Sequence, residues 1–424
     1  MAGVAALFTR EFFEAARRRL AEHGVICQWV NTYDISLADL QSVVATFTAV
    51  FPHATLWLAG DGDLMLVGSP DAMEPRVDQL ATPWTRPEVV SDLQTVAVHS
   101  PFSVLSMFLG ADEAAARFAS GAPVQTDDRM ALEFSAPRAL HTVARKDNVT
   151  QLRALVDSER RPAAVTRAWA DASGADRAQR ALMLRRAGAF EPAYDAARDA
   201  LDHAPERADA LQMLVETAAA TGRQADATVL LTSIVRRSPD LVAPRVALAK
   251  LYAASGSFDR AIRTAIEAVQ LHPDDGAALE QLASIYADAG DAERLGPVVA
   301  TLARFTGRAG SRYYTAANHF LRGEFEQAQL AAQQALSLDP GFARAENLLG
   351  AIHATRGDTG SARRAFEASL SLDPQDPSTY QNLALLELNT GNAATAARLF
   401  GEALSLDPAS EPARQGLARA RGAK

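Results

Sequence analysis

Two pairs of carboxylates are the residues whose spacing could support acid–base chemistry. Asp127 and Asp128 are adjacent, and Asp61 and Asp63 are separated by one glycine. Two carboxylates can act as acid and base when their environments separate their pKa values. Adjacent residues of a strand point to opposite faces, so the first pair is expected to cap or turn the chain, and the second lies in a predicted turn. His53 has no Cys or His near it in the sequence. We therefore expect no catalytic residue and no metal site among them.

The single cysteine and the net charge exclude further classes of site. One thiol, Cys27, cannot form an internal disulfide or a multi-cysteine metal site. It lies in the apolar run from Val25 to Trp29, which predicts a buried thiol that packs as a small hydrophobic residue. The formal net charge is -9, without a long basic run. This argues against nucleic-acid binding and against electrostatic docking on anionic lipid.

The length of the chain, 424 residues, is enough for two or three domains, and 48% hydrophobic residues can bury a core. No apolar stretch approaches the roughly 20 residues that span a bilayer. The sequence from Met1 to Phe13 lacks the basic-then-apolar order of a signal peptide. The chain as given is therefore expected in the cytoplasm. A longer product with an upstream transmembrane region would instead be attached to a membrane.

Three residue types recur at a nearly constant spacing in the second part of the sequence. The glycines of this series are Gly188, Gly222, Gly256, Gly290, Gly323, Gly357 and Gly391. Prolines keep the same spacing from Pro205 to Pro408, with one missing, and an alanine lies five residues after most of the glycines. Such a period indicates a repeat solenoid. Each repeat is expected to be two antiparallel helices, with the glycine at their turn, the alanine at their close contact and the proline after the second helix.

This pattern resembles the tetratricopeptide repeat family. One repeat follows the family signature closely with Leu349-Gly350, His353, Ala362, Phe366 and Pro374. The resemblance implies an all-α, right-handed solenoid of seven repeats over residues 174–410. A last helix, Glu411 to Arg421, would cap the apolar face of the seventh repeat within residues 411–424.

One repeat departs from the family pattern. Leu295 replaces the close-packing alanine, and Pro297 follows it. We expect the superhelix to be irregular there, through sequence drift or as a functional hinge.

Solenoids of this family bind protein segments in a concave groove lined by the first helix of each repeat. The register predicts that nine side chains face this groove: Arg185, Gln212, Glu216, Lys250, Glu280, Tyr313, Phe320, Asn347 and Gln381. Their charges are mixed, and they lack the repeated Lys/Asn set that holds a C-terminal carboxylate in some family members. Two interpretations stay open, a defined peptide site and helix faces that are merely solvated.

Residues 1–138 have a different, α/β pattern. Thr9 to His23 is predicted to be a helix capped by Thr9 and stopped by Gly24, and Ser36 to Phe51 a second helix capped by Ser36. Val25 to Asn31 is a predicted buried strand. Two further strands, Ala54 to Gly60 and Asp63 to Ser69, are joined by a hairpin signal.

This order resembles the spermidine synthase (polyamine aminopropyltransferase) family, a group of transferases in polyamine biosynthesis. Matching strings are spread over the segment: LFTREFF at 7–13, GVICQW at 24–29, VFPH at 50–53, GDLMLVG at 62–68, TDDR at 126–129, LEF at 132–134 and APR at 136–138. The resemblance implies a truncated methyltransferase-like (Rossmann-like) half-domain over residues 1–138, which carries only the last three of about seven strands. The half that binds the nucleoside of decarboxylated S-adenosylmethionine, and the catalytic aspartate, would lie upstream. We therefore expect no cofactor in this chain, and we expect a fragment or a start codon assigned too late, since residues 1–4 resemble an internal segment.

Three expectations follow from this resemblance. Gln28 matches a position beside the substrate pocket and would be a remnant of that pocket. The strand Val25 to Asn31 would keep one unpaired apolar edge, through which copies of the protein could self-associate. Residues 139–173 are expected to be a helical connector, with helices at Asn148 to Ser158 and Pro162 to Ala172, that docks on the first repeat.

Two main functions remain. The first is a repeat scaffold that recruits a protein partner and carries an inactive aminopropyltransferase-like segment. The second is a fragment of a transferase that moves an aminopropyl group to a polyamine. A third, a membrane-linked assembly factor, rests only on transporter-like fusions in the resembling family.

Overall fold

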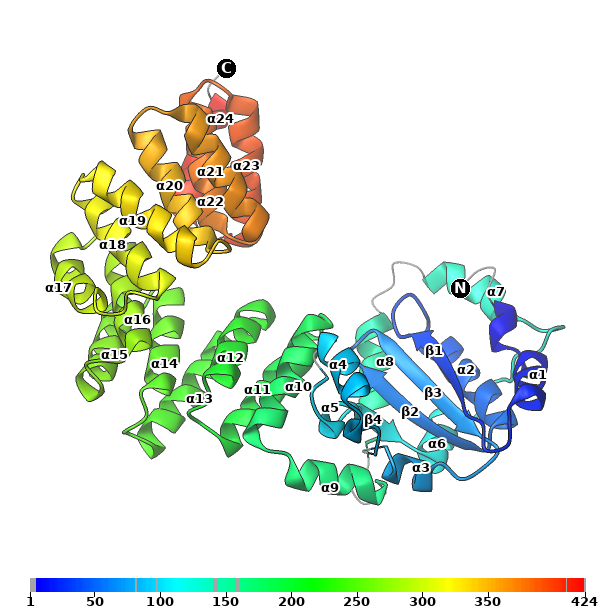
Figure 1. Cartoon of the computed structure of the whole chain (residues 1–424). Helices are drawn as coiled ribbons and strands as arrows, with labels where there is room; N and C mark the ends of the chain where they lie inside the picture. The colour runs from blue at the N-terminus through cyan, green and yellow to red at the C-terminus, as the bar shows by residue number, and fades with distance from the viewer. Residues whose placement is uncertain are drawn as a thin grey trace. The chain divides into compact units, whose positions relative to one another are not determined.

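The computed structural model describes residues 5–80, 82–96, 98–139, 144–156, 161–408 and 410–422. Residues 1–4, on which the expectation of a late start codon rests, lie outside them. Its packing separates two compact units, Met1–Arg237 and Ser238–Lys424. The first unit contains a sheet with helices and two helix pairs, and the described residues of the second form helix pairs and one last helix (Figure 1).

Four strands form one sheet in the first unit. They are β1 (Ile26–Asn31), β2 (His53–Ala59), β3 (Asp63–Ser69) and β4 (Phe108–Gly110). The order is β1-β3-β2-β4, and each neighbouring pair is antiparallel (Figure 1). The predicted hairpin joins β2 to β3, and Gly60 adopts a left-handed φ of 65° there. The three strands predicted from the sequence are thus confirmed, whereas the short β4 was not expected.

A helical layer covers one face of this sheet. It includes α1 (Arg10–Arg19), α2 (Leu37–Val50), α6 (Asp112–Phe118) and α8 (Ala144–Arg153), with a 3-10 turn, η1 (Ala5–Phe8), before α1. The predicted caps are confirmed, because the side chain of Thr9 accepts from the Phe12 amide and that of Ser36 from the Asp39 amide. Helix α1 ends before its predicted limit at His23. Under this layer the rings of Phe13, Phe47 and Phe51 pack in one fully buried cluster.

The opposite face of the sheet is covered at its β2 and β4 side. Trp57 and Phe108 pack there with residues of α3 (Glu74–Asp78), α5 (Pro101–Leu105) and α9 (Ala163–Asp171). Further short elements are η2 (Thr82–Thr85), α4 (Pro87–Thr95) and α7 (Ala131–Ala139). Helices α8 and α9 correspond to the two predicted connector helices, although the predicted end of the first, Ser158, lies outside the described residues.

The edge strand β1 corrects one prediction. Cys27 was expected to be buried, but its side chain is exposed, as are Val25 and Trp29. These alternate residues point to the sheet face whose apolar cluster does not reach β1. Although the sequence run is apolar, it belongs to an edge strand that is covered on one side only.

Seven helix pairs follow the connector. They are α10 (Gly174–Arg186) with α11 (Phe190–His203), α12 (Ala208–Thr221) with α13 (Gln224–Arg237), α14 (Ala243–Ala254) with α15 (Phe258–Leu271), α16 (Gly276–Asp288) with α17 (Ala292–Leu302), α18 (Ala309–Leu321) with α19 (Phe325–Leu338), α20 (Ala343–Thr355) with α21 (Thr359–Leu372), and α22 (Pro377–Asn389) with α23 (Ala393–Leu406). The first two pairs belong to the first unit. Helix α24 (Glu411–Gly422) follows the last pair and packs on it through Ala413 and Ala420, as predicted for a cap.

The periodic residues occupy the predicted positions in these pairs. All seven glycines between paired helices have φ between 69 and 87°, the left-handed region that glycine enters without strain. The periodic alanines from Ala193 to Ala396 are fully buried. In the irregular repeat, α17 has 11 residues where the other second helices have 14, and it contains Pro297. Leu295 is completely buried in place of the alanine. The irregularity of this repeat is therefore confirmed.

None of the helices within the described residues is both long enough and apolar enough to cross a bilayer.

Candidate functional site

A groove of about 510 Å³ lies on the first helices of consecutive pairs in the second unit. Helices α14 and α16 supply most of its wall, and α15, α18 and α20 add one residue each, which for α15 is Phe258. Its lining is Lys250, Ala253, Ala254, Phe258, Ala277, Glu280, Gln281, Ser284, Asp288, Tyr314 and Arg344. Two of the predicted groove residues, Lys250 and Glu280, are thus brought together here.

Arg344 lines this groove from the first turn of α20. Its guanidinium lies 3.4 Å from Ser284 Oγ, from Tyr314 Oη and from a carboxylate oxygen of Asp288. It also lies 4.9 Å from the ring centroid of Tyr313, within cation–π range. Burial opposes its charge, but Tyr313, Tyr314 and Asp288 together raise the pKa of Arg344. A positive charge is therefore held in the groove by long, weak contacts.

Glu280 and Lys250 differ in how their charges are satisfied. Glu280 accepts two hydrogen bonds from Arg308, at 2.7 and 2.8 Å, in a bidentate pair that raises the pKa of Arg308. Lys250 is exposed and makes no ion pair with any described residue. Beside it the ring of Phe258 is 48% exposed. The groove thus offers two cations, Lys250 and Arg344, next to an accessible aromatic ring.

The two predicted aromatic residues, Tyr313 and Phe320, are not in the lining of this groove, and both make ring contacts. Tyr313 stacks edge-on against Tyr314 and Phe342, with ring centroids about 5 Å apart. Phe320 packs against Phe325 beside a buried cluster. The neighbouring Tyr314, not Tyr313, lines the groove.

The predicted amides Asn347 and Gln381 lie outside the groove lining and are engaged locally. Asn347 accepts a hydrogen bond of 2.9 Å from Asn382, which links α20 to α22. Gln381 accepts one of 3.3 Å from Ser410.

The three predicted residues of the first unit form a polar cluster of their own on α10 and α12. Gln212 donates to Glu216 at 2.7 Å, and the other carboxylate oxygen of Glu216 lies 3.5 Å from Arg185 Nε. All three side chains are partly or fully exposed. Their placement on first helices of two successive pairs follows the predicted register.

Sequence reasoning indicated only Lys250 and Glu280 of the lining, and the missed residues include the group formed by Ser284, Asp288, Tyr314 and Arg344. Ser284 and Asp288 follow Glu280 at steps of four residues, so helical spacing alone places them on the same face. Arg344 carries no comparable signal, because it reaches residues 56 and 60 positions earlier in the sequence.

The candidates within residues 1–138 have local partners. Gln28 is half-buried in β1, and its amide donates to the Trp29 carbonyl at 3.0 Å. Asp127 and Asp128 lie in a turn closed by Thr126 and Arg129, as predicted. Within the described part of the chain, no group of three or more His, Cys, Asp or Glu side chains is placed to hold a metal ion.

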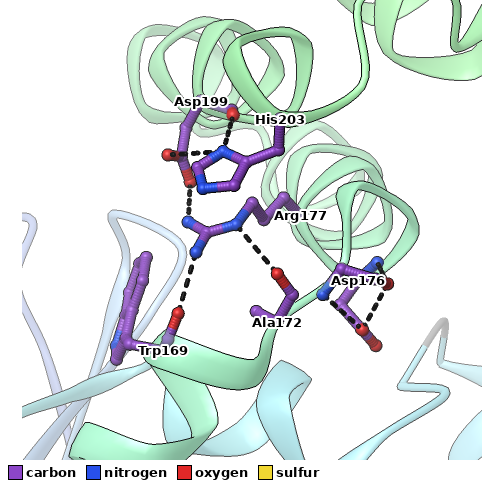
Figure 2. A network of polar contacts seen from close by, with 7 residues as sticks. Trp169, Ala172, Asp176, Arg177, Asp199 and His203 are labelled. Carbon is purple, nitrogen blue, oxygen red and sulfur yellow. Dashed lines mark hydrogen bonds and ion pairs between the residues drawn. The ribbon is translucent and has the colours of Figure 1, made fainter.

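A buried arginine joins the connector to the first helix pair (Figure 2). Arg177 of α10 donates to the backbone carbonyls of Trp169 and Ala172, at 2.8 and 3.2 Å, where α9 ends. It also donates to Asp199 of α11 at 2.6 Å, and the Asp199 carbonyl in turn contacts His203 at 2.9 Å. A cation at a helix C-terminus complements the helix dipole. The predicted docking of the connector on the first repeat is therefore confirmed.

Two segments of the second unit, residues 242–285 and 314–377, match family models described as tetratricopeptide repeat. These segments are tetratricopeptide repeats. The two matched segments lie on the pairs that build the groove, α14 to α21.

Solved structures are similar to the chain at low identity. A tetratricopeptide repeat protein of Thermus thermophilus is 23% identical and covers 42% of this chain and 97% of its own, with a TM-score of 0.39. One from Parabacteroides merdae is 15% identical and covers 58% and 98%, with a TM-score of 0.46. YrrB, titled a repeat protein with an unusual peptide-binding site, is 17% identical and covers 44% and 96%, with a TM-score of 0.28. No curated protein sequence matches the chain.

Proposed function

We propose that this protein is an interaction scaffold that binds a peptide segment of a partner protein in the groove on α14 to α20. The observation that carries the proposal is the pair of cations, Lys250 and Arg344, beside the exposed ring of Phe258. A volume of about 510 Å³ suits a few residues of an extended peptide, since small-ligand sites span roughly 300–1,000 Å³.

The same contacts indicate which peptide would fit. Arg344 is held by three contacts of 3.4 Å, so a peptide carboxylate can approach it more closely than its present partners do. An apolar side chain next to that carboxylate would cover Phe258. The partner segment is therefore expected to present an acidic side chain, or the free carboxylate of a peptide terminus, adjacent to an apolar residue.

Selection from a random peptide library on the full-length protein tests this proposal. Enriched peptides should combine a carboxylate with an apolar residue, and Arg344→Gln should weaken their binding at least tenfold, because charged hydrogen bonds contribute about 1.5–3 kcal/mol. Arg304→Gln is the matched control, since Arg304 is 62% exposed, belongs to the same unit and lies outside the groove lining. Equal peptide binding by both variants, or no enrichment of such peptides, would contradict the proposal. It would favour the other interpretation, in which these helix faces are merely solvated.

For residues 1–138 we propose an incomplete spermidine synthase-like segment that is inactive by itself, with Gln28 as a remnant of the polyamine pocket. The order helix, strand, helix, strand, strand supports this proposal. So does β1, which pairs with β3 alone among the described strands and could therefore continue a larger sheet. Such a segment would hold no cofactor without its nucleoside-binding half.

Calorimetric titration of the protein with decarboxylated S-adenosylmethionine and with methylthioadenosine tests that second proposal. We expect no heat of binding. Micromolar binding would instead support the alternative, a transferase that moves an aminopropyl group to a polyamine. Self-association through β1 is a related proposal, which sedimentation of the protein and of a Trp29→Lys variant would check, because Trp29 is exposed on that strand.

A further inference from the structure

A cavity of about 300 Å³ lies within the first unit. Its walls come from the sheet edge at β2 and β4, from the connector and from α10 and α11. Three arginines, Arg153, Arg161 and Arg180, line it together with apolar side chains that include Leu58, Met107 and Met183. Asp195 is the acidic residue among the described lining.

The charges around this cavity do not balance locally. Arg153 pairs with Asp61 at 2.6 Å, and Asp195 is engaged by Arg223 at 2.9 Å. No carboxylate of the described residues lies within ion-pair distance of Arg161 or Arg180. The Nε of Arg161 is moreover buried without a hydrogen-bond partner in that part of the protein. Since buried polar atoms are nearly always hydrogen-bonded, the guanidinium of Arg161 here lacks a partner that would satisfy it.

Three arginine side chains contact the same indole ring. The guanidinium carbons of Arg161, Arg177 and Arg180 lie 5.5, 5.7 and 5.2 Å from the ring centroid of Trp169. Each contact is a cation–π attraction, but the like charges of the guanidinium groups repel one another. Burial, together with the charges of Arg153 and Arg177, lowers the pKa of Arg180 to about 10, and the charges of Asp199 and Asp195 offset this only in part. Arg177 already has a partner in Asp199, which leaves Arg161 and Arg180 as the two cations of the group without a carboxylate partner among the described residues.

We propose that this cavity binds one small organic anion, whose phosphate or carboxylate head is held by Arg161 and Arg180. Guanidinium groups bind both kinds of oxyanion through paired N–H donors. The apolar body of the ligand would lie against Leu58, Met107 and Met183. The volume of about 300 Å³ is at the lower end of the range for small-molecule sites, so it admits one compact molecule.

Such a ligand would also join three parts of the first unit. It would touch the sheet edge, the connector and the first repeat at once, because each supplies part of the wall. Binding would therefore stabilise the docking of the connector on α10 and α11. This inference is independent of the peptide groove, which belongs to the second unit.

Calorimetric titration of the full-length protein in phosphate-free buffer, at constant ionic strength, tests the proposal. The probes are inorganic phosphate, phenyl phosphate and benzoate, with chloride as the reference for non-specific charge effects. We expect phenyl phosphate or benzoate to bind more tightly than inorganic phosphate, because their rings bury apolar surface. Whichever of phenyl phosphate and benzoate binds more tightly shows whether the cavity prefers a phosphate or a carboxylate head group.

Matched variants assign the binding to the cavity. The double substitution Arg161→Gln, Arg180→Gln should weaken the best probe at least tenfold. Arg186→Gln removes the same charge from an exposed position on α10 and should leave binding unchanged. If the double variant does not fold, Arg180→Gln alone serves in its place. Binding of no probe above chloride, or equal binding by the variants and Arg186→Gln, would overturn the proposal.

Thermal melting supplies an independent readout. Without an anion, the double variant should melt no lower than the wild type, because it loses two repelling cations. The best probe should raise the melting temperature of the wild type and of Arg186→Gln, but not that of the double variant. A double variant that melts several degrees lower without a probe, and is stabilised by it as the wild type is, would show that the arginines are packing residues.

Discussion

Replacement of Gly350 by alanine tests the tight contact between the two helices of one repeat. Gly350 lies inside α20, and a Cβ atom there would come within 2.5 Å of Cδ1 and Cε1 of Phe366 on α21. Phe366 is 1% exposed, so its ring has no free space to enter. The substitution must therefore separate the helices or move the ring.

The magnitude follows from two opposing effects. Overpacking of a core costs about 1–3 kcal/mol, whereas glycine to alanine inside a helix gains about 1 kcal/mol. We expect Gly350→Ala to lower the free energy of unfolding by up to about 2 kcal/mol. Gly401→Ala is the matched control, because Gly401 lies inside α23 and a Cβ atom there meets no described atom within 4 Å. It should stabilise the protein by up to about 1 kcal/mol.

Hydrogen exchange resolved along the sequence measures both effects where they arise, since a repeat array can open in segments. Amides of α20 and α21 should exchange up to about 30 times faster in Gly350→Ala than in the wild type if up to about 2 kcal/mol is lost locally. Phe366→Leu should relieve the collision, so that Gly350→Ala costs less in that background. Equal exchange in Gly350→Ala and Gly401→Ala, or no coupling to Phe366, would refute the assigned contact.

Four further substitutions test other parts of the fold. Ala362→Arg or Ala396→Arg would place a long charged side chain at a fully buried contact, and each should cost at least about 1–3 kcal/mol; unchanged melting temperatures for both would contradict the repeat register. Arg177→Gln should release the end of α9 at a cost of about 1–3 kcal/mol, seen as faster hydrogen exchange in α9, whereas unchanged exchange there would contradict the link. The hydrogen bond from Arg363 lowers the pKa of Glu387 below the ordinary 4.5. The charged carboxylate therefore stabilises the folded state at pH values above 4.5, and this stabilisation is lost as the pH falls through the lowered pKa. Glu387→Gln should therefore be less stable than the wild type at neutral pH, and a pH series of urea unfolding should show the difference shrinking in acid; a constant difference would exclude this linkage.

The repeat architecture could be predicted from the sequence because its signals are local and redundant. A glycine that must adopt a positive φ and an alanine that must be small each constrain one position, and every further copy of the repeat presents the same constraint again. The Thr9 and Ser36 caps are local in the same sense, since each bonds an amide three residues ahead. Such features need no knowledge of the tertiary fold.

The remaining features depend on contacts between distant residues. Cys27 lies in an apolar run, but its exposure depends on which elements cover β1. Arg344 reaches the groove only because α16, α18 and α20 stack beside one another. The candidate groove could therefore be predicted only in part. The repeat register indicated Lys250 and Glu280, whereas the second cation of the groove, Arg344, could be placed there only from the structure.

The position of Trp169 among its arginines has a practical consequence for spectroscopy. All four tryptophans of the protein, Trp29, Trp57, Trp84 and Trp169, belong to the first unit. Selective excitation of tryptophan fluorescence therefore reports on that unit alone, and the second unit contributes no tryptophan emission. Positive charges close to an indole shift its emission, so Trp169 is a built-in optical probe of the arginine-lined cavity. Unfolding of the repeats beyond residue 238 must instead be followed through backbone circular dichroism, and the difference between the two signals separates the melting of one unit from that of the other.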